Sequence, residues 1–469
     1  MPARYIRHSM EPPTDLDAVG GKLVEALERY LKIVRDNLAY IHGDSVYTGI
    51  PGIIVMLQIV SSVQSNLKLA YRFDADLPDL LSLEKLQRYD PNDPAKLSFL
   101  ETPIGLAVLA ALNTEAGHSS FCTDKLRDAI DSIAKHVDNS DDGSEVLYGR
   151  AGFLYGLLFL RSLISRRAST GTSKSAEEGT TALEKLVSDS SLSIVIQSII
   201  QRGRVGAELY ASETSSVRGP SGCVPPLMWS WHGKRYLGAA HGVVGILHTL
   251  LLCPIGLIER YLPEIIQTAE WLISLQDGEG NWPTKAPSRS IGQHRNEDSN
   301  DLVQWCHGAP GTLILLAKIL QLSDSEPLKF NISPSTHSSI IVSLRGGASI
   351  VYRHGLLRKG IGLCHGIAGS VYSLLAVTDA MALVDDDGNK RDSRYYFIRA
   401  AHLAELATTF ETLTKEREMK VPDRPLSLFG GLAGMCCAWG EVCDRIRRAS
   451  NRVENWYRPR SGMPGYDDL

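Results

Sequence analysis

The chain has 469 residues, 43% of them hydrophobic, and a formal net charge of −4 at pH 7. This length and apolar content can build one large repetitive domain or two to three smaller ones. The slightly negative charge, with no basic stripe, excludes a typical nucleic-acid-binding surface, so we expect no nucleic-acid partner.

From its first residues we expect no targeting signal in this sequence. It begins Met-Pro-Ala-Arg-Tyr-Ile-Arg-His, which lacks the apolar region of a secretory signal peptide and the glycine that myristoylation needs. The stretch from Leu237 to Ile258 has no Asp, Glu, Lys or Arg, but two histidines, four glycines and Pro254 interrupt it. This pattern favours a buried inner helix over a membrane span, and we expect no transmembrane segment.

Eight cysteines are scattered through the chain. Without a secretory signal, reduced thiols or metal ligands are expected and disulfides are not, so we expect a cytoplasmic protein. Free cysteine packs as a small hydrophobe. On this basis we interpret six of the eight as core residues: Cys122, Cys223, Cys253, Cys436, Cys437 and Cys443.

Taken in chain order, the residues up to about Asp15 form an extended arm. Apolar residues at helical spacing then predict an amphipathic helix from Leu16 to Leu38. A loop that ends in Gly49-Ile50-Pro51-Gly52 follows, and a more apolar helix is predicted from Ile53 to Val60. This unit of amphipathic helix, glycine loop and apolar helix recurs along the chain.

Seven loops have this character, each with a closing glycine three residues after a Gly or, once, a Thr. Successive closing glycines are between 47 and 93 residues apart, periods that are typical of helix-pair repeats. If the helices close into a ring, the seven loops meet around one axial pocket and could contact a ligand there. For the first three loops, the alternative is that they are only helix caps and tight turns, with no ligand. The loops are 49–52, 102–105, 149–152, 242–245, 308–311, 366–369 and 431–434.

These repeats predict an all-α protein with about seven helical hairpins and one domain over residues 16–450. The widest interval contains Ser165 to Thr181, which is rich in Ser, Thr, Ala and Gly. We interpret it as a surface insertion, and residues 451–469 as a C-terminal tail.

Two of the loops carry the triplet Cys-His-Gly. Cys306 and Cys364 each precede a histidine and a Gly-x-x-Gly loop, and they are 58 positions apart. A catalytic zinc takes three protein ligands from such residue types and leaves one position open. Cys306, Cys364 and His365 would supply these ligands, whereas a structural zinc site would show a close pair such as Cys-x2-Cys, which does not occur here.

Over most of its length, from about Val46 to Trp439, the chain resembles the eukaryotic lanthionine synthetase C-like proteins. The resemblance implies a double-layered α/α barrel, or toroid, with seven inner and seven outer helices. It also implies a zinc ion at one mouth, bound by Cys306, Cys364 and His365. The segments that carry the resemblance are Tyr47-Thr48-Gly49, Leu147-Tyr148-Gly149-Arg150, Trp231-His232-Gly233-Lys234, Gly238-Ala239-Ala240-His241-Gly242, Trp305-Cys306-His307-Gly308-Ala309-Pro310-Gly311, Gly355-Leu356-Leu357-Arg358-Lys359-Gly360, Gly362-Leu363-Cys364-His365-Gly366 and Ser427-Leu428-Phe429.

The implied activity is the addition of glutathione to dehydroalanine or dehydrobutyrine residues of proteins or peptides. A metal ion favours the thiolate over the thiol, the thiolate attacks the β-carbon, and the resulting enolate needs a proton. His241 opens its glycine loop and matches the family's catalytic histidine, so we expect it to be the general acid. The alternative is a histidine that only satisfies buried backbone groups.

Other positions match active-site residues of the bacterial members of the family. His307 stands where they have a tyrosine, and it either orients the enolate or hydrogen-bonds behind the metal ligands. Glu145 stands where they have an aspartate, and it either pairs with His241 or is a solvated loop acid. Leu302 stands where they carry an arginine, a departure that leaves His241 as the main candidate.

The two carboxylates of glutathione should meet cations, because charge-assisted pairs are the stronger ones. Lys359 matches a glutathione contact of the family. Lys420 stands where the family has an arginine, which would weaken bidentate binding. Arg4 or Arg7 in the N-terminal arm would be a third cation. For each of them the alternative is a solvated surface charge.

Three functions remain open: the transferase, a non-catalytic zinc- and glutathione-binding scaffold or signalling adaptor, and a different enzyme on a related toroid. An ionisable His241 disfavours the second, because binding alone does not need it. A glycosidase on a six-hairpin toroid would need two carboxylates across the pocket, for which the loops offer Glu101 and Glu145. A protein prenyltransferase β-subunit would need an Asp-Cys-His set that the loops lack. A closed ring leads us to expect a monomer.

Overall fold

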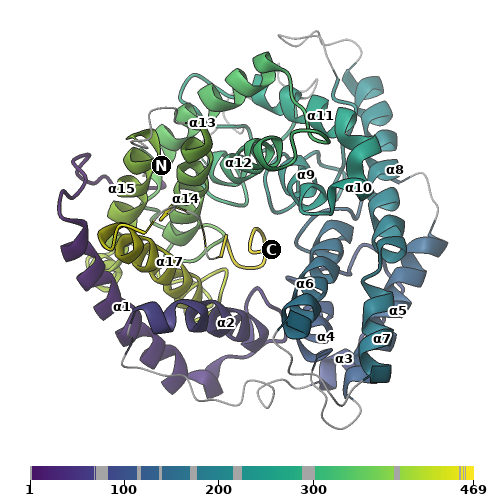
Figure 1. Ribbon diagram of the computed structural model, residues 1–469, viewed down its shortest axis with the longest axis horizontal. Helices are drawn as coiled ribbons and strands as arrows, with labels where there is room; N and C mark the ends of the chain where they lie inside the picture. Colours follow the sequence, from purple (N-terminus) through teal and green to yellow (C-terminus); the bar gives the residue numbers. More distant parts are fainter. Residues whose placement is uncertain are drawn as a thin grey trace.

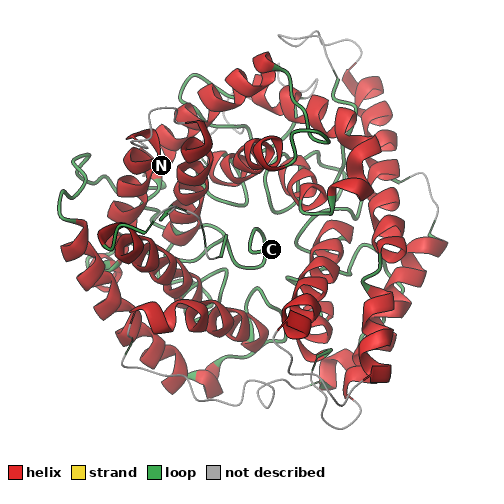
Figure 2. Ribbon diagram, in the orientation of Figure 1, coloured by secondary structure: helices red, strands yellow, loops and turns green. Residues whose placement is uncertain are grey.

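Regular structure in the described part of the chain is entirely helical, and no strand occurs there (Figure 2). The all-α prediction is therefore confirmed. The computed structural model describes residues 3–67, 69, 83–112, 118–136, 140–169, 177–214, 224–287, 302–384, 391–453, 456–457, 459 and 461–469.

An inner ring of helices surrounds the axis of the molecule (Figure 1). Each of its helices begins within or directly after one of the seven glycine loops. Each contacts the next around the ring, and the last contacts the first, which closes it. The inner helices are α2 (Ile50–Leu67), α4 (Ile104–Ala110), α6 (Arg150–Ser169), α9 (Val243–Leu251), α12 (Ala309–Ser325), α14 (Ile367–Val384) and α17 (Leu432–Ser450).

A second layer of helices lies outside the first, so the predicted double-layered α/α barrel is confirmed (Figure 1). Its long members are α1 (Leu16–Asp36), α5 (His118–Lys135), α8 (Asp189–Thr214), α11 (Leu262–Ser274), α13 (Pro334–His354) and α15 (Arg391–Ala407). Shorter elements complete the described helices: η1 (Leu38–Tyr40), α3 (Glu84–Arg88), α7 (Glu177–Leu186), α10 (Ile255–Ile258), η3 (Glu259–Tyr261) and α16 (Phe410–Lys415).

The two layers differ in how much of each helix is buried. Helix α1 buries one face, and the Asp15 carboxylate accepts a hydrogen bond from the Ala18 N–H at its N-terminus. Inner helix α9 is buried along its whole length, as expected for the uncharged stretch from Leu237 to Ile258. Helix α14 is long and apolar enough to cross a membrane by length and composition, and 89% of it is buried inside the barrel.

The closing glycine of each loop is a steric requirement. A Cβ at Gly105 would lie 2.0 Å from the Phe99 carbonyl oxygen, and one at Gly245 would lie 1.9 Å from that of Ala239. The same approach to the carbonyl six residues earlier occurs in the other five loops. The spacing therefore shapes the entry into each inner helix, whether or not a ligand is present.

The two ends of the chain both meet the barrel. The arm packs beside the loop before α14, where the Ile6 N–H donates to the Leu356 carbonyl at 2.7 Å and Tyr5 forms an isolated bridge with Leu357. Residues 461–469 enter the centre of the ring (Figure 1).

The expected insertion is described only at its ends. Residues 165–169 belong to the end of α6 and residues 177–181 to the start of α7, whereas 170–176 lie outside the described residues. Of the six cysteines expected in the core, five are buried and free, as predicted: Cys122, Cys253, Cys436, Cys437 and Cys443. Cys223 lies outside the described residues.

Replacing Gly105 by alanine should destabilise the fold, because the new methyl group meets a backbone carbonyl that cannot move away. We expect the free energy of unfolding to fall by about 1–3 kcal/mol. Gly21 is the matched control: it is exposed on α1 with no atom within 4 Å of the added Cβ. Gly21→Ala should raise stability by about 1 kcal/mol. Denaturant unfolding measures both, and equal stabilities of the two variants would contradict the steric explanation.

Candidate active site

The loops before the inner helices are joined to one another by backbone hydrogen bonds. The Cys306 N–H donates to the Cys364 carbonyl at 3.3 Å, and the Cys364 N–H donates to the Phe429 carbonyl at 2.9 Å. The Phe429 N–H donates to the Tyr47 carbonyl at 3.1 Å, and the Tyr47 N–H to that of Leu100 at 2.9 Å. Loops from five distant parts of the sequence are thus fixed side by side.

The same linkage continues around the other half of the mouth. The Leu97 N–H donates to the Tyr148 carbonyl at 2.7 Å, and the Val146 N–H to the Ala240 carbonyl at 3.1 Å. The circle closes at Gly238, which packs directly against the Cys306 loop. A Cβ added to Gly238 would lie only 2.0 Å from the Cys306 carbonyl oxygen. The chemical groups on these loops therefore face one common mouth.

Two thiols meet on one side of this mouth. Cys306 and Cys364 are buried, and the Cys364 thiol hydrogen-bonds to Cys306. That hydrogen bond lowers the pKa of Cys306, and the positive charge of Lys359 adds to the effect. The Gln304 side-chain amide donates to the Cys306 sulfur at 3.2 Å, and the Tyr47 hydroxyl hydrogen-bonds to Cys364. The predicted pairing of two loops 58 residues apart is therefore present.

The third predicted ligand follows Cys364 directly. Burial lowers the pKa of His365 to about 4, and Lys359 adds to this, so its imidazole is neutral at pH 7. Within the described residues, no three His, Cys, Asp or Glu side chains lie close enough together to hold a metal ion. The structure thus assembles two of the three predicted ligands. Two thiols and a neutral imidazole are donors that suit zinc by their chemistry, and the full ligand set remains a prediction.

A histidine and a carboxylate pair on the loops that adjoin the Cys306 loop in the ring. His241 Nδ1 lies 3.0 Å from Glu145 Oε2, and the Glu145 side chain is only 1% exposed. The same carboxylate accepts hydrogen bonds from the backbone N–H groups of Leu147 and Tyr148, both at 2.7 Å. Burial raises the pKa of Glu145, and the hydrogen bond to His241 opposes that rise. Glu145 is therefore a partner of His241, and the solvated-acid alternative is excluded.

An aromatic wall supports the His241 ring. The Trp231 indole stacks on it with ring centroids 3.8 Å apart and planes 10° apart, and the Tyr148 ring lies parallel to both. Trp231 was not predicted as a site residue, although it lies in a segment that carries the family resemblance. No sequence pattern shows which ring it contacts.

His307 lies between the two sides. Its ring centroid is 5.6 Å from that of Tyr236, and burial lowers its pKa to about 4, with a further contribution from the charge of His241. In the described part of the chain, His307 Nδ1 is buried without a hydrogen-bond partner. Leu302 lies behind this loop, where its carbonyl accepts a hydrogen bond from Asn281 at 3.1 Å. A neutral imidazole therefore stands next to Cys306.

Glu101 is a second carboxylate near the mouth. Burial raises its pKa, and the negative charge of Glu145 adds to that rise. A glycosidase would need both carboxylates accessible to substrate and water, but Glu145 is buried and occupied by three hydrogen-bond donors. This arrangement disfavours the glycosidase alternative.

The three predicted glutathione-binding cations come from segments that lie next to one another. The Arg358 N–H donates to the Arg4 carbonyl at 3.0 Å, and the Arg358 carbonyl accepts from the Lys420 N–H at 2.8 Å. Lys359 follows directly, and its charge lowers the pKa values of both Cys306 and His365. Arg4, Lys359 and Lys420 are all exposed. The structure thus gathers on the thiol side of the mouth cations that are more than 400 positions apart in sequence.

Comparison with known proteins gives a consistent family assignment. The profile of the family "Lanthionine synthetase C-like protein" matches residues 40–449. "LanC-like protein GCL1" of Arabidopsis thaliana is 30% identical over 303 residues, which are 64% of this chain and 55% of that protein. "Glutathione S-transferase LANCL1" of Danio rerio is 25% identical over 320 residues, 67% of this chain and 62% of that protein. The matched regions therefore span less than two thirds of each relative.

Among solved structures, the protein is similar to "Nisin cyclase", with a TM-score of 0.46 and 14% sequence identity. This match covers 91% of the present chain and 94% of the other.

The lowered pKa values of two histidines predict how stability depends on pH. The metal-free folded protein keeps His307 and His365 neutral down to about pH 4, whereas the unfolded chain protonates them near 6.5. Because the unfolded state binds protons first, stability present above about pH 6.5 is lost as pH falls towards 4. Denaturant midpoints between pH 7 and pH 4.5 measure this loss.

The variant His307→Gln removes one of the two groups and should make that pH dependence shallower. His232→Gln, at an exposed position on the same rim, is the matched control and should leave it unchanged. Parallel pH profiles for the parent protein and His307→Gln would contradict the burial of a neutral imidazole.

Proposed function

The chain belongs to the lanthionine synthetase C-like protein family, and from this premise we propose that it adds glutathione, in a zinc-dependent reaction, to dehydroalanine or dehydrobutyrine residues of proteins or peptides. The observation that carries the proposal is that two different chemical groups lie on adjoining loops of one ring. A hydrogen-bonded pair of thiols, Cys306 and Cys364, lies beside the loop of the His241–Glu145 pair, because Gly238 packs directly against the Cys306 carbonyl. The name of the Danio rerio relative supports glutathione as the thiol.

We propose that Cys306, Cys364 and His365 hold the zinc ion. Its ligands must be deprotonated: burial already keeps the His365 imidazole neutral, with its pKa lowered to about 4, and the hydrogen bond from Cys364 lowers the pKa of Cys306. Burial raises the pKa of Cys364, so this thiol would lose its proton on binding the metal. When bound, the zinc would supply the Lewis acidity that favours the thiolate form of the incoming thiol. The Tyr47 hydroxyl and the Gln304 amide hydrogen-bond to the two cysteine sulfurs and would hold them in place.

The cations Arg4, Lys359 and Lys420 would bind the two carboxylates of glutathione. They line the same side of the mouth as the cysteines, so a glutathione bound to them would present its thiol near Cys306 and Cys364. Lys420 would act as a point charge, because a lysine ammonium lacks the bidentate geometry of a guanidinium.

The addition requires one proton to be lost and one to be gained. The glutathione thiol loses its proton and its sulfur bonds to the β-carbon, while the C=C electron pair moves into the adjacent carbonyl as an enolate. Protonated His241 then donates to the α-carbon from Nε2, because Nδ1–H is held by Glu145. Such acid catalysis contributes about 10²–10⁴-fold to the rate, and the proton released by the thiol restores the balance.

Cys364→Ala should lose zinc and catalytic activity together, since metal affinity depends on every ligand. Metal analysis measures the zinc, and mass spectrometry of a dehydroalanine peptide incubated with glutathione measures the adduct. Cys253→Ala, which replaces a buried core cysteine, is the matched control and should keep both. A fully zinc-loaded, active Cys364→Ala protein would refute the ligand assignment, and zinc binding without any adduct in the parent protein would favour a non-catalytic binding protein.

His241→Ala should keep zinc and glutathione binding but lower the rate of addition by roughly 10²-fold or more. The matched control is His232→Ala, an exposed histidine one residue from Trp231, which should keep the parent rate. Initial rates of adduct formation at saturating glutathione distinguish the two. Unchanged turnover in His241→Ala would remove this residue from the mechanism.

A further inference from the structure

Residues 461–469, here called the axial segment, fill the centre of the inner ring (Figure 1). The Tyr466 and Asp467 N–H groups both donate to the Met463 carbonyl, at 3.1 and 2.8 Å, which folds the segment into a compact turn. Met463 and Tyr466 are each 1% exposed. The segment is therefore packed as tightly as the barrel core around it.

Polar contacts anchor the axial segment to the inner helices. The Tyr155 hydroxyl of α6 donates to the Asp468 carboxylate, which also accepts from the Gly465 N–H at 3.1 Å. Asp467 Oδ1 lies 3.1 Å from Nε2 of the fully buried His248 in α9. Two neighbouring inner helices, α6 and α9, thus hold the segment on the axis of the barrel.

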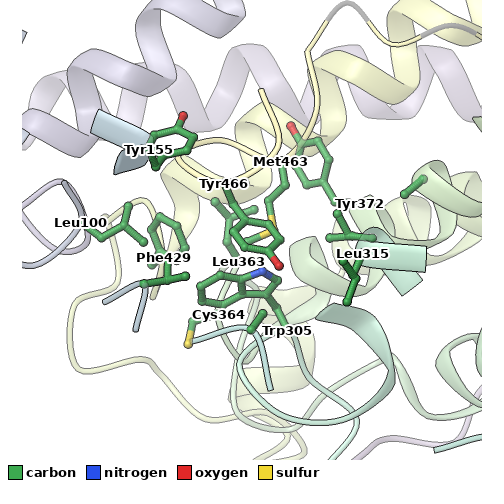
Figure 3. Close-up of a cluster of buried hydrophobic side chains, with 14 of the residues drawn as sticks. Leu100, Tyr155, Trp305, Leu315, Leu363, Cys364, Tyr372, Phe429, Met463 and Tyr466 are labelled. Carbon is green, nitrogen blue, oxygen red and sulfur yellow. The ribbon is translucent and has the colours of Figure 1, made fainter. Parts of the chain in front are cut away.

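Tyr466 lies directly against the loops that carry the predicted zinc ligands. Its ring stacks on His248 with centroids 4.3 Å apart and meets the Trp305 ring edge-on at 5.1 Å. Figure 3 shows Tyr466 and Met463 grouped with Trp305, Leu363 and Cys364. Trp305 and Leu363 are the residues immediately before Cys306 and Cys364, so this cluster touches the backs of both ligand loops.

The aromatic contacts of Tyr466 continue to the residues that hydrogen-bond to Cys364. Trp305 packs on Phe429 at 5.4 Å, and Phe429 stacks on Tyr47 at 4.8 Å. The Phe429 carbonyl accepts the Cys364 N–H, and the Tyr47 hydroxyl hydrogen-bonds to the Cys364 sulfur. A continuous set of aromatic contacts therefore leads from Tyr466 to both sides of Cys364.

We propose that the axial segment is the floor of the metal site and that Tyr466 is a positioning residue for Cys306 and Cys364. The statement that the axial segment supports a metal site rests on the proposed function. The statement that Tyr466 holds the two cysteine loops in place does not. The physical reason is that the ligand loops have no core of their own: their inner faces need atoms on the axis to pack against. Removing those atoms would leave a cavity beneath Trp305 and let the loops move.

The test compares four purified full-length proteins: the parent, Tyr466→Ala, Tyr466→Phe and Trp456→Ala. Tyr466→Phe is the rescuing variant, because the Tyr466 hydroxyl is buried without a hydrogen-bond partner in the described part of the chain and only the ring makes the contact. Trp456→Ala is the matched control, because it also removes an aromatic ring near the C-terminus but away from the cysteine loops. The Trp456 ring packs on Phe397 of outer helix α15, with centroids 4.9 Å apart.

The first readout is hydrogen exchange of the metal-free proteins at the amides of Cys306 and Cys364, which donate across the loops. Tyr466→Ala should lose protection there while the amide of Gly105 keeps it. The second readout is zinc affinity by chelator competition, which should weaken about 10–100-fold, as for other changes behind metal ligands. Tyr466→Phe and Trp456→Ala should match the parent in both readouts.

Parent-like exchange and zinc affinity in a folded Tyr466→Ala protein would overturn the proposal, as would equal loss of protection at Gly105. If the parent binds no zinc, the proposed function fails, and the exchange comparison alone decides whether the axial segment positions the loops. If Tyr466→Ala does not fold, Tyr466→Leu replaces it in the test. The leucine keeps most of the apolar volume but removes the aromatic ring that contacts Trp305, and the same outcomes support or overturn the proposal.

Discussion

The structure depends on one constraint, the circle of backbone hydrogen bonds and close contacts that joins the loops before the inner helices. The two cysteine loops, the Phe429 loop and the Tyr47 loop are bonded in succession. These bonds depend on a glycine in the first turn of each inner helix, which lets the chain pass against a carbonyl six residues earlier. A side chain at those positions would push the loops apart. The repeated glycine thus sets the geometry of the mouth, and the chemistry of each loop is added to that frame.

This frame divides the mouth into two sides with different electrostatics. The thiol side carries Cys306 and Cys364 beneath the exposed cations, and the charge of Lys359 favours the thiolate of Cys306. The other side carries the His241–Glu145 pair against the Trp231 ring. The thiol pair and the histidine–carboxylate pair therefore lie on adjoining loops of one ring, and the proposed thiol addition would use both. The axial segment closes this space from below.

Those features of the fold and the site that depend on residues close together in the sequence could be predicted from it. Apolar periodicity and the glycine spacing predicted one inner helix at each loop, because both act within one turn of the chain. The helices begin inside the loops and not after them: the first inner helix starts at Ile50, three residues before the predicted Ile53. The echo of Cys-His-Gly predicted that Cys306 and Cys364 meet. The pairing of Glu145 with His241 was left open, because it depends on which loops become neighbours when the ring closes. The contacts of Tyr47, Trp231 and Tyr466 were not predicted for the same reason: their partners lie far away in sequence, and no local pattern marks them.

We propose that Cys306, Cys364 and His365 hold a zinc ion that keeps one position open for a thiol. X-ray absorption at the zinc edge of the loaded protein tests it most directly, with and without glutathione. We expect two sulfur neighbours at about 2.3 Å, together with nitrogen or oxygen neighbours, and a third sulfur when glutathione is added. A zinc site without sulfur neighbours, or one that glutathione leaves unchanged, would contradict it.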